Sequence, residues 1–451
     1  MVCEGLARKK KLAARAGLAL DECRMSLLDA QVLPRMFPLR QEFPRSPRLD
    51  VAAVVRDEVG RVSGRLQRGQ RIAVTVGSRG IANLAAIVHA VLEELRKAEV
   101  KPFILPAMGS HGGATPEGQR RILADFGITE ETMGVPIEVA MEASEIGRTP
   151  DGLPAFTSEA ALAADGIVVL NRVKPHTDYF SRTIGSGLIK MMVVGMGKHT
   201  GAANFHRTSV RLGYEDALRA LGRVVLGNVP ILFGIALVED QHHETSRVEA
   251  ILPEDIEARE GELFAEAAAL MPGLPFDDID LLVVDRIGKN LSGPGMDPNV
   301  IGRNAHHYST LLRNALEARP FVRRVFVRGL TPETHGNAIG IGLADATTRR
   351  LAEEMDAEAT FVNVRTSLTL HNAKLPMQFE TDEEAIAALL DTVALDDPAQ
   401  ARVLRIANTL ELTDVEASEA FHEEAASRKD LTVMGGPVGW AFDGEGNLAD
   451  L

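Results

Sequence analysis

The apolar positions in the first half of the chain form short runs of strand length separated by longer stripes of helical spacing. A run at residues 71–77 is followed by a stripe within residues 82–97 and then by a second run at residues 102–107. This order predicts a βαβ unit, and its short, almost wholly apolar strands indicate a sheet that is covered on both faces. Thr115 followed by Pro116 has the pattern of an N-cap with proline in the first turn, which predicts a helix that ends near Gly127.

The alternation of strands and helices continues to about residue 270, where the clearest linker begins. Proline and glycine in the segment MPGLP, residues 271–275, block continuation of the preceding helix. A second series of strands and helices follows it. Before the linker we also expect strands at 166–170 and 231–238 and helices at about 201–212, 216–226 and 256–270; after it we expect strands at 280–284, 325–327 and 360–364 and helices at 345–355 and 382–393.

These elements predict an α/β protein made of two α/β domains with a ligand cleft between them. The length of 451 residues is sufficient for two such cores. We assign residues 1–30 to an N-terminal extension, residues 31–270 to the first domain and residues 276–426 to the second. Residues 427–451 are a candidate to complete the first domain.

Charge and cysteine usage narrow the class of protein. The formal net charge is −14 and the basic residues are dispersed, which argues against nucleic acid or an anionic membrane as a partner. No window approaches the roughly 20 apolar residues of a membrane span. The basic run at residues 8–11 precedes an apolar stretch that Arg15 and Asp21 interrupt, so we interpret it as a solvated extension. Both cysteines, Cys3 and Cys23, lie there, which excludes a disulfide framework and makes the cytoplasm the expected compartment.

The candidate chemistry lies in short polar motifs at the ends of predicted strands. The GxGxxG, Walker A and HExxH motifs are absent, which removes the commonest patterns for dinucleotide, nucleotide and zinc-protease sites. In open α/β sheets, ligands bind at the carboxyl ends of strands. The motifs are GSR at residues 77–79, GSHGGAT at 109–115, KPHTD at 174–178, GSGLIK at 185–190 and KHTGAANFH at 198–206.

Taken in this order, the five motifs resemble those of the lactate racemase family, the nickel-pincer racemases and epimerases of 2-hydroxy acids. The likeness covers about residues 71–263 and is weaker through the rest of the chain. It depends most on the SGxxK element and on a histidine sixteen residues after its lysine. The resemblance implies an isomerase that inverts C2 of a small 2-hydroxy acid and carries a nickel pincer nucleotide on the first domain.

The resemblance assigns residues to this cofactor, a pyridinium dithio-type mononucleotide. Lys190 matches the lysine that holds the cofactor through a thioamide bond. His206 matches the histidine that binds the nickel. An imidazole suits Ni(II) in a square plane with the carbon and two sulfurs of the pincer. Spacing alone leaves His199 open, because seven residues are two helical turns, and the resemblance decides for His206.

Small residues around these positions are expected to contact the cofactor as well. Gly187 and its neighbour Gly185 lack a Cβ and so would allow close approach of the backbone. Ser110, Thr115 and Ser186 are candidates for phosphate or hydroxyl contacts at helix N-termini, although capping of those helices explains them equally well.

The acid/base and substrate residues also come from the resemblance. His111 and His176 match two catalytic histidines, and one base for each enantiomer suits imidazole because its unperturbed pKa of about 6.5 lies near neutrality. Arg79 matches an arginine that binds the substrate, for which a planar guanidinium fork is suited. In the second domain, Lys289 and Asn290 follow a predicted strand and are candidates only; His335 and Lys374 are weaker ones.

Two other functions remain open at this point. A zinc hydrolase would need His111, His176 and His206 to converge on one metal with an open fourth position. A non-catalytic relative would bind 2-hydroxy acids without inverting them. The stretch between His176 and Lys190 is longer than in lactate racemase itself, which leaves the acid undetermined. The resemblance also implies cofactor maturation enzymes as partners, while the sequence does not indicate an oligomeric state.

Overall fold

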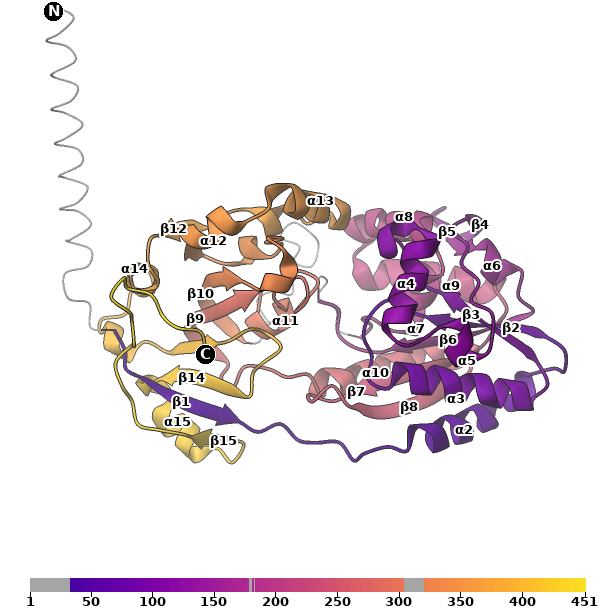
Figure 1. Ribbon diagram of the computed structural model, residues 1–451, viewed down its shortest axis with the longest axis horizontal. Helices are drawn as coiled ribbons and strands as arrows, with labels where there is room; N and C mark the ends of the chain where they lie inside the picture. Colours follow the sequence, from indigo (N-terminus) through magenta and orange to yellow (C-terminus); the bar gives the residue numbers. More distant parts are fainter. Residues whose placement is uncertain (1–32, 178–180, 182, 304–319) are drawn as a thin grey trace, which may run out of the picture. The chain divides into compact units, whose positions relative to one another are not determined.

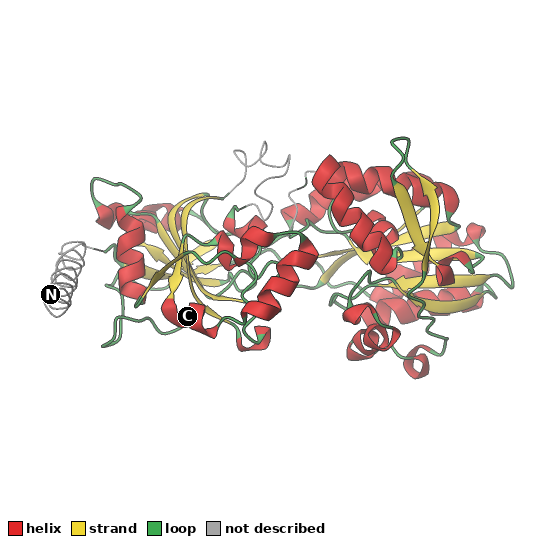
Figure 2. Ribbon diagram, turned by 90° about the horizontal axis from the view of Figure 1, so that it is seen from above, coloured by secondary structure: helices red, strands yellow, loops and turns green. Residues whose placement is uncertain are grey.

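The computed structural model describes residues 33–177, 181, 183–303 and 320–451, which form two compact units. Unit 2 contains residues 43–272, and unit 1 contains residues 33–42 together with the described residues from 273 onward. The division at Pro272 and Gly273 falls inside the predicted linker. Both units are α/β, which confirms the predicted fold class (Figures 1 and 2). The expected extension at residues 1–30 lies outside the described residues.

The core of unit 2 is a five-stranded sheet with the strand order β3-β2-β6-β7-β8 (Figure 1). The first four strands in this order are parallel, and β8 is antiparallel to β7. A separate antiparallel pair, β4 and β5, accompanies this sheet. The strands are β2 (Arg71–Val76), β3 (Lys101–Pro106), β4 (Ala143–Arg148), β5 (Pro154–Ser158), β6 (Gly166–Arg172), β7 (Ile231–Glu239) and β8 (Thr245–Ile251).

Both faces of this sheet are buried, as the apolar runs predict. Ile167 and Val169 of β6 contribute to the core on one face, whereas Val168 and Leu170 contribute to the core on the other. This alternation follows from the two-residue period of a strand, and it explains why β6 has no polar position before Asn171.

Helices supply the other half of each core. Residues of α2 and α3 belong to one core cluster, and residues of α7 to α10 belong to the other. Thr115 caps α4 through a hydrogen bond from the Gly118 amide, as the Thr-Pro pattern predicts. The helices are α2 (Val51–Val62), α3 (Leu84–Lys97), α4 (Pro116–Asp125), α5 (Glu130–Met133), α6 (Glu159–Leu162), α7 (Leu188–Lys190), α8 (Lys198–Leu212), α9 (Tyr214–Asn228) and α10 (Ile256–Ala269).

Unit 1 is built on an eight-stranded sheet with the order β12-β11-β10-β9-β13-β14-β1-β15. The strands from β12 to β13 are parallel, and β14, β1 and β15 extend the sheet by antiparallel pairing. The strands of unit 1 are β1 (Met36–Gln41), β9 (Asp278–Ile287), β10 (Phe321–Leu330), β11 (Ala346–Thr348), β12 (Met377–Phe379), β13 (Val403–Ile406), β14 (Asp414–Ser418) and β15 (Leu431–Val433). The helices of unit 1 are α11 (Pro298–Ile301), α12 (Arg349–Glu354), α13 (Ala357–Ser367), α14 (Asp382–Asp391) and α15 (His422–Ser427).

The two ends of the chain differ from the assignment made on sequence. Residues 31–270 were expected to form one domain, with 427–451 as a candidate to complete it. In the structure β1 and β15 pair with each other, and β1 also pairs with β14, so residues 33–42 and 427–451 both belong to unit 1. Strand pairing over such a separation leaves no trace in local sequence patterns.

One predicted strand of unit 1 is wrong. Residues 360–364 lie in the middle of α13, where Asp356 caps the helix through a hydrogen bond from the Ala359 amide. The β-branched and aromatic side chains of this segment favoured a strand, and the capping aspartate four residues earlier outweighs them. The helix expected at 345–355 begins with the short strand β11 and becomes helical only from Arg349.

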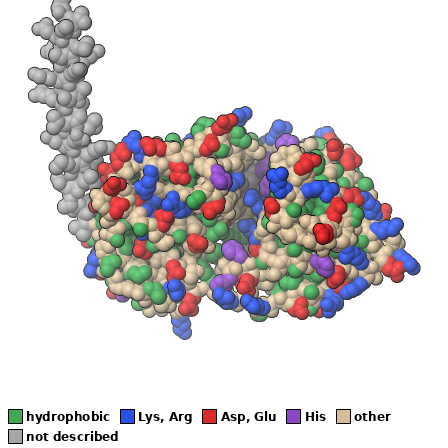
Figure 3. All heavy atoms as spheres, viewed as in Figure 1, with side chains coloured by type: hydrophobic (Ala, Val, Ile, Leu, Met, Phe, Trp, Pro, Cys, Tyr) green, Lys and Arg blue, Asp and Glu red, His purple; other side chains and the backbone are tan. Residues whose placement is uncertain are grey.

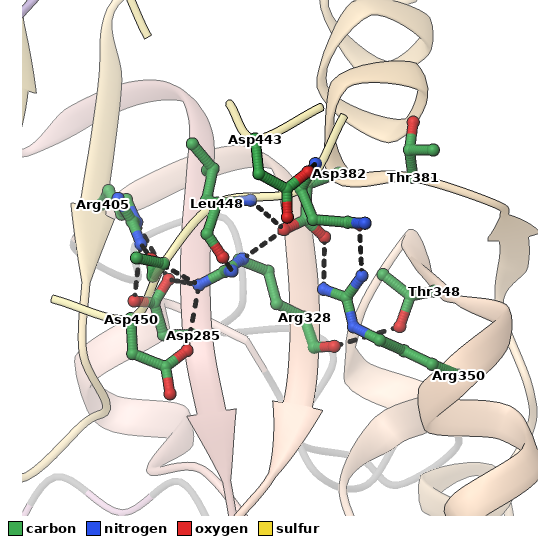
Figure 4. A network of polar contacts seen from close by, with 12 residues as sticks. Asp285, Arg328, Thr348, Arg350, Thr381, Asp382, Arg405, Asp443, Leu448 and Asp450 are labelled. Atoms are coloured by element: carbon green, nitrogen blue, oxygen red, sulfur yellow. Dashed lines mark hydrogen bonds and ion pairs between the residues drawn. The ribbon is translucent and has the colours of Figure 1, made fainter. Parts of the chain in front are cut away.

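A buried network of charges occupies the centre of the unit 1 sheet (Figure 4). Arg328 of β10 contacts Asp285 at 2.7 Å and Asp382 at 2.8 Å, and these three side chains are at most 4% exposed. Arg405 makes a second ion pair with Asp285 at 2.9 Å, and Arg350 makes one with Asp382 at 2.6 Å. Each buried charge therefore has an opposite charge within hydrogen-bonding distance.

Charged side chains of both signs lie on the surface of the described residues (Figure 3). On the face in Figure 3, acidic and basic side chains are interspersed over the described residues. Within the part of the chain that the structure describes, no helix combines the length and the apolar character needed to cross a membrane.

Candidate functional site

Three of the sequence motifs meet at one edge of the unit 2 sheet. Strands β3, β2 and β6 are neighbours and parallel, so their carboxyl ends lie on the same side. The loop with His111 follows β3, the GSR motif follows β2, and the segment with His176 follows β6. This is the edge at which open α/β sheets bind ligands.

Lys190 and His176 are in direct contact. Lys190 Nζ lies 2.6 Å from His176 Nε2 and 3.4 Å from Ser186 Oγ. Two backbone hydrogen bonds of 2.8 Å between Lys174 and Ser186 hold the two segments together. The structure therefore brings together residues of two separate motifs, KPHTD and GSGLIK.

The turn that carries Lys190 is held by side chains from three elements, of which Tyr214 and Glu260 are buried. Asn171, at the end of β6, donates to the Gly187 carbonyl at 2.8 Å, and Tyr214 donates to the Gly185 carbonyl at 2.9 Å. Glu260 of α10 accepts from the amide of Ile189 at 2.9 Å. Because the backbone is fixed on both sides of Ser186 and next to Lys190, the amine emerges in one direction.

Gly185 and Gly187 were expected to let the backbone approach the cofactor, but in the structure a Cβ at either position would meet protein atoms. A Cβ on Gly185 would lie 2.3 Å from the Lys174 carbonyl oxygen, and one on Gly187 would lie 2.3 Å from Glu260 Oε1. The protein itself fills the space that these glycines leave open. They are therefore required for packing of the turn, whereas contact of Gly187 with the cofactor stays a prediction.

A row of aromatic rings connects His176 with His206. The His176 and Tyr214 rings lie 5.0 Å apart, the Tyr214 and Phe205 rings 5.6 Å, and the Phe205 and His206 rings 5.7 Å, each measured between centroids. Tyr214 and Phe205 are fully buried. His206 of α8 therefore belongs to the same packed group as Lys190 and His176, while His199 makes no such ring contact among the described residues.

His111 is held from both sides of its loop. Its Nδ1 contacts Ser78 Oγ, which follows β2. The side chain of the buried Gln119 donates to the carbonyls of Gly109 and His111 at 3.2 and 3.4 Å. The Ser78 contact therefore involves Nδ1, one of the two ring nitrogens of His111.

The His111 loop also packs on the segment after Lys190. Residues Met191–Gly195 form a π-helical turn, a feature often found at functional sites. The Gly109 amide donates to the carbonyl of Gly195 at 3.1 Å. The His111 loop and the Lys190 segment are thus parts of one structure.

Lys198 is a buried lysine at the start of α8. Its Nζ donates to the Pro106 carbonyl at 2.5 Å and to Gln119 Oε1 at 3.1 Å, and the residue is fully enclosed. Burial lowers the pKa of Lys198 to about 8. Through Gln119 it supports the backbone of the His111 loop.

The remaining predicted residues of unit 2 have simpler surroundings. Arg79 is exposed and forms no hydrogen bond or ion pair with any residue that the structure describes, which leaves its guanidinium available to a ligand. Thr115 caps α4, so helix capping explains the presence of a threonine at this position. The Ser110 carbonyl accepts from the Ala114 amide within the loop. Ser186 lies beside Lys190, as described above.

The predicted residues of unit 1 engage other groups of that unit. Lys289 Nζ donates to the Gly293 carbonyl at 3.0 Å and to Asn363 Oδ1 at 2.8 Å. Asn290 accepts from the hydroxyl of Thr331 at 2.7 Å. His335 adopts a left-handed backbone conformation at the end of a short helical turn. Substrate contact by Lys289 therefore stays a prediction.

Sequence reasoning missed five residues that hold this site. Ser78 and Lys198 lie inside two of the quoted motifs, and Tyr214 is one of three tyrosines in the chain, which was a usable signal. Gln119 and Glu260 lie on helices whose polar positions look like solvated faces. Nothing in their spacing shows that they point inward.

Burial changes the titration of Glu260. The side chain is fully enclosed, its Oε1 has no hydrogen-bond partner among the described residues, and burial raises its pKa to about 7. The folded chain thus keeps this proton between pH 4.5, the ordinary value, and about pH 7, where the unfolded chain has lost it. The free energy of unfolding of unit 2 is therefore expected to fall as pH rises through this window and to level off above it, by a total on the order of 3 kcal/mol.

Amide hydrogen exchange of peptides from β6 and α10, corrected for the intrinsic rate, measures this slope. Glu260→Gln should flatten it, whereas Glu262→Gln, an exposed position on the same helix, should leave it in place. A slope that persists in Glu260→Gln would assign the effect to another group.

The donor set fits a cofactor that needs one protein ligand. Within the described ranges, no three side chains of His, Cys, Asp or Glu gather in a way that could hold a metal ion. A zinc hydrolase requires three such ligands, so the convergence of His111, His176 and His206 that it needs is not formed. A cofactor that brings its own donor atoms would need only one imidazole from the protein, which the half-buried His206 could supply.

Comparison with known proteins agrees with this geometry. Residues 61–214 match the family model described as the lactate racemase N-terminal domain. The chain is similar in structure to the lactate racemase apoprotein from Thermoanaerobacterium thermosaccharolyticum, with 13% identity, a TM-score of 0.50, and coverage of 83% of this chain and 94% of that one. A protein from Thermotoga maritima has 11% identity, a TM-score of 0.49, and coverage of 82% and 99%. No curated protein matches by sequence.

At these identities the structural likeness shows the fold alone, and the family rests on the matched segment. That segment contains His111, His176, Lys190 and His206. On this match, residues 61–214 are assigned to the lactate racemase N-terminal domain.

Proposed function

We propose that this chain is a racemase or epimerase that inverts C2 of a small 2-hydroxy acid, with a nickel pincer nucleotide attached to Lys190. The observation that carries the proposal is the contact of Lys190 with His176 at the edge where the His111 loop also lies. An attachment amine, two imidazoles and a candidate nickel ligand occur together in one unit. That combination is what inversion on a tethered metal-bearing ring requires.

Each residue has a defined task in this proposal. His206 binds the nickel, and when bound the cofactor supplies a hydride acceptor for the C2 hydrogen. His111 and His176 take the hydroxyl proton of the acid and return it, one imidazole for each enantiomer. Arg79 binds the carboxylate through its planar fork. The Ser78 contact holds the His111 ring so that its other nitrogen faces the substrate.

The proposal extends to the rest of the predicted setting. Lys289 is proposed to contact the substrate. The partners are the small acid and the cofactor maturation enzymes, and the compartment is the cytoplasm, where those enzymes would meet the chain.

Peptide mass mapping tests the attachment. The chain co-produced with the maturation enzymes of the family is expected to carry an adduct on the peptide with Lys190, and Lys190→Ala should lack it. Lys101, which is exposed in the same unit, provides the control, because Lys101→Ala should keep the adduct. An unmodified Lys190 under these conditions would contradict the proposal. Bound 2-hydroxy acid without inversion in the loaded chain would indicate a non-catalytic relative.

A further inference from the structure

The contact between Lys190 and His176 joins two residues that the proposed function uses for different purposes. Lys190 attaches the cofactor, and His176 moves the proton of the substrate. An Nε2 atom that lies 2.6 Å from a lysine amine shares a hydrogen with that amine. It is not then available to a hydroxyl group of a substrate. The contact therefore belongs to an earlier stage than turnover.

We infer that His176 first acts as the base that activates Lys190 for attachment of the cofactor, and that attachment then releases His176 for turnover. The inference rests on the proposed function, since it concerns the same lysine. It adds a step that the chain performs on itself before it meets any 2-hydroxy acid.

The surroundings of His176 suit a fixed base. The residue is 8% exposed, its ring packs against Tyr214, and the backbone of the same segment is bridged to Ser186. The turn with Lys190 is fixed by Asn171 and Glu260. Neither partner has to move for the amine and the imidazole to meet. A preorganised pair of nucleophile and base within hydrogen-bond distance is the usual arrangement for covalent chemistry by a side chain.

The chemistry of a thioamide bond requires such a base. An ammonium group has no lone pair, so only the neutral form of Lys190 can attack the carbon of a thiocarboxylic acid. As the C–N bond forms, the nitrogen becomes cationic and His176 Nε2 takes its proton. The imidazolium then gives that proton to the oxygen on the same carbon. The acidic hydrogen of the thiocarboxylic acid supplies the second proton, the C–O bond breaks, one water leaves, and the carbon is left doubly bonded to sulfur. Sulfur stays on the carbon, and nothing is oxidised or reduced.

The product changes the bond that holds His176. A thioamide nitrogen is neutral and has one hydrogen, whereas the ammonium group has a positive charge and three. The charge-assisted contact is therefore lost when Lys190 is attached, and Nε2 no longer shares a hydrogen with an ammonium group. Attachment and release of the base are one event, so the chain acquires its catalytic base only with its cofactor.

Acetylation of the chain without cofactor tests the activation directly. A limiting amount of the N-hydroxysuccinimide ester of acetic acid is added between pH 6.5 and 8.5, and peptide mass spectrometry follows each lysine. Lys190 is expected to react faster than the more exposed Lys101, because it has a base at hand. Lys198 provides a second reference: burial lowers its pKa to about 8, yet it is enclosed and should stay unmodified.

Variants assign the effect to the imidazole. His176→Ala should slow acetylation of Lys190 by about 10-fold or more, in line with the usual contribution of a general base. Added imidazole should restore much of the rate, which a purely structural role of His176 would not allow. His243→Asn, at an exposed turn of the same unit, should react like the parent chain. Equal rates for Lys190 and Lys101 in the parent chain, or a parent rate in His176→Ala without imidazole, would overturn the inference.

The same variants separate this inference from the proposed function. If Lys190 reacts quickly in the parent chain but no adduct forms with the maturation enzymes, the proposed function fails and the activation stands. If His176→Ala gains the adduct as fast as the parent chain, the activation fails and the proposed function stands.

Discussion

Replacing His111 by asparagine is expected to reduce inversion of 2-hydroxy acids by roughly 10²–10⁴-fold, the usual contribution of a general acid or base. Asparagine keeps a polar atom that can contact Ser78, so the loop after β3 should retain its shape. What it removes is Nε2, the nitrogen proposed to exchange a proton with the substrate. Chiral chromatography of lactate, malate, a longer aliphatic acid and a sugar acid with the cofactor-loaded chain measures the loss.

The control for this prediction is the attachment itself. His176, and not His111, is the base proposed to activate Lys190, so His111→Asn should carry the adduct in the same yield as the parent chain. His243→Asn should keep both the adduct and the turnover, since this residue lies in an exposed turn. Turnover of His111→Asn within about threefold of the parent would remove His111 from the mechanism.

Replacing Arg328 by methionine is expected to lower the free energy of unfolding of unit 1 by roughly 3–5 kcal/mol. Arg328 is the cation between Asp285 and Asp382, and all three side chains are almost fully buried (Figure 4). Methionine fills a similar volume but leaves both carboxylates with less positive charge in a medium that solvates them poorly. The loss is therefore much larger than the value of an exposed ion pair.

The single tryptophan of the chain makes this measurement specific. Trp440 lies in unit 1, so its fluorescence in a denaturant titration reports that unit separately from unit 2. Arg40→Met is the matched control, because Arg40 pairs with Asp414 on the same sheet but both side chains are exposed. Its expected effect is at most about 1 kcal/mol. A similarly small loss in Arg328→Met would mean that Arg350 and Arg405 suffice to neutralise the two carboxylates.

The elements of unit 2 were predictable because each strand and helix has its own local pattern. The run at 71–77 corresponds to β2 (Arg71–Val76), and the stripe at 82–97 corresponds to α3 (Leu84–Lys97). The position of β1 was not predictable, because its partners β14 and β15 lie at the other end of the chain. Helix α13 was missed because one capping aspartate outweighs a strand-like composition.

The site was predictable as a set of motifs and not as an arrangement. The ends of β2, β3 and β6 could be brought to one edge because parallel strands align their carboxyl ends. The contact of His176 with Lys190 could not be found from spacing, since it depends on the bridge between Lys174 and Ser186. Glu260 and Tyr214 come from helices far along the chain, and only the folded core brings them under the turn.

The pairing of β1 has a consequence for synthesis on the ribosome. Arg40 pairs with Asp414, a separation of 374 residues, so the strand emerges long before its neighbours exist. Unit 2 can fold meanwhile, because residues 43–272 contain its whole sheet. Until β14 and β15 are made, the apolar side chains of Met36, Phe37 and Leu39 lack strands that bury them in the folded unit. The apolar β1 segment is thus exposed between its own synthesis and that of β14 and β15. A chaperone that binds the nascent chain would lower the risk of aggregation during this time.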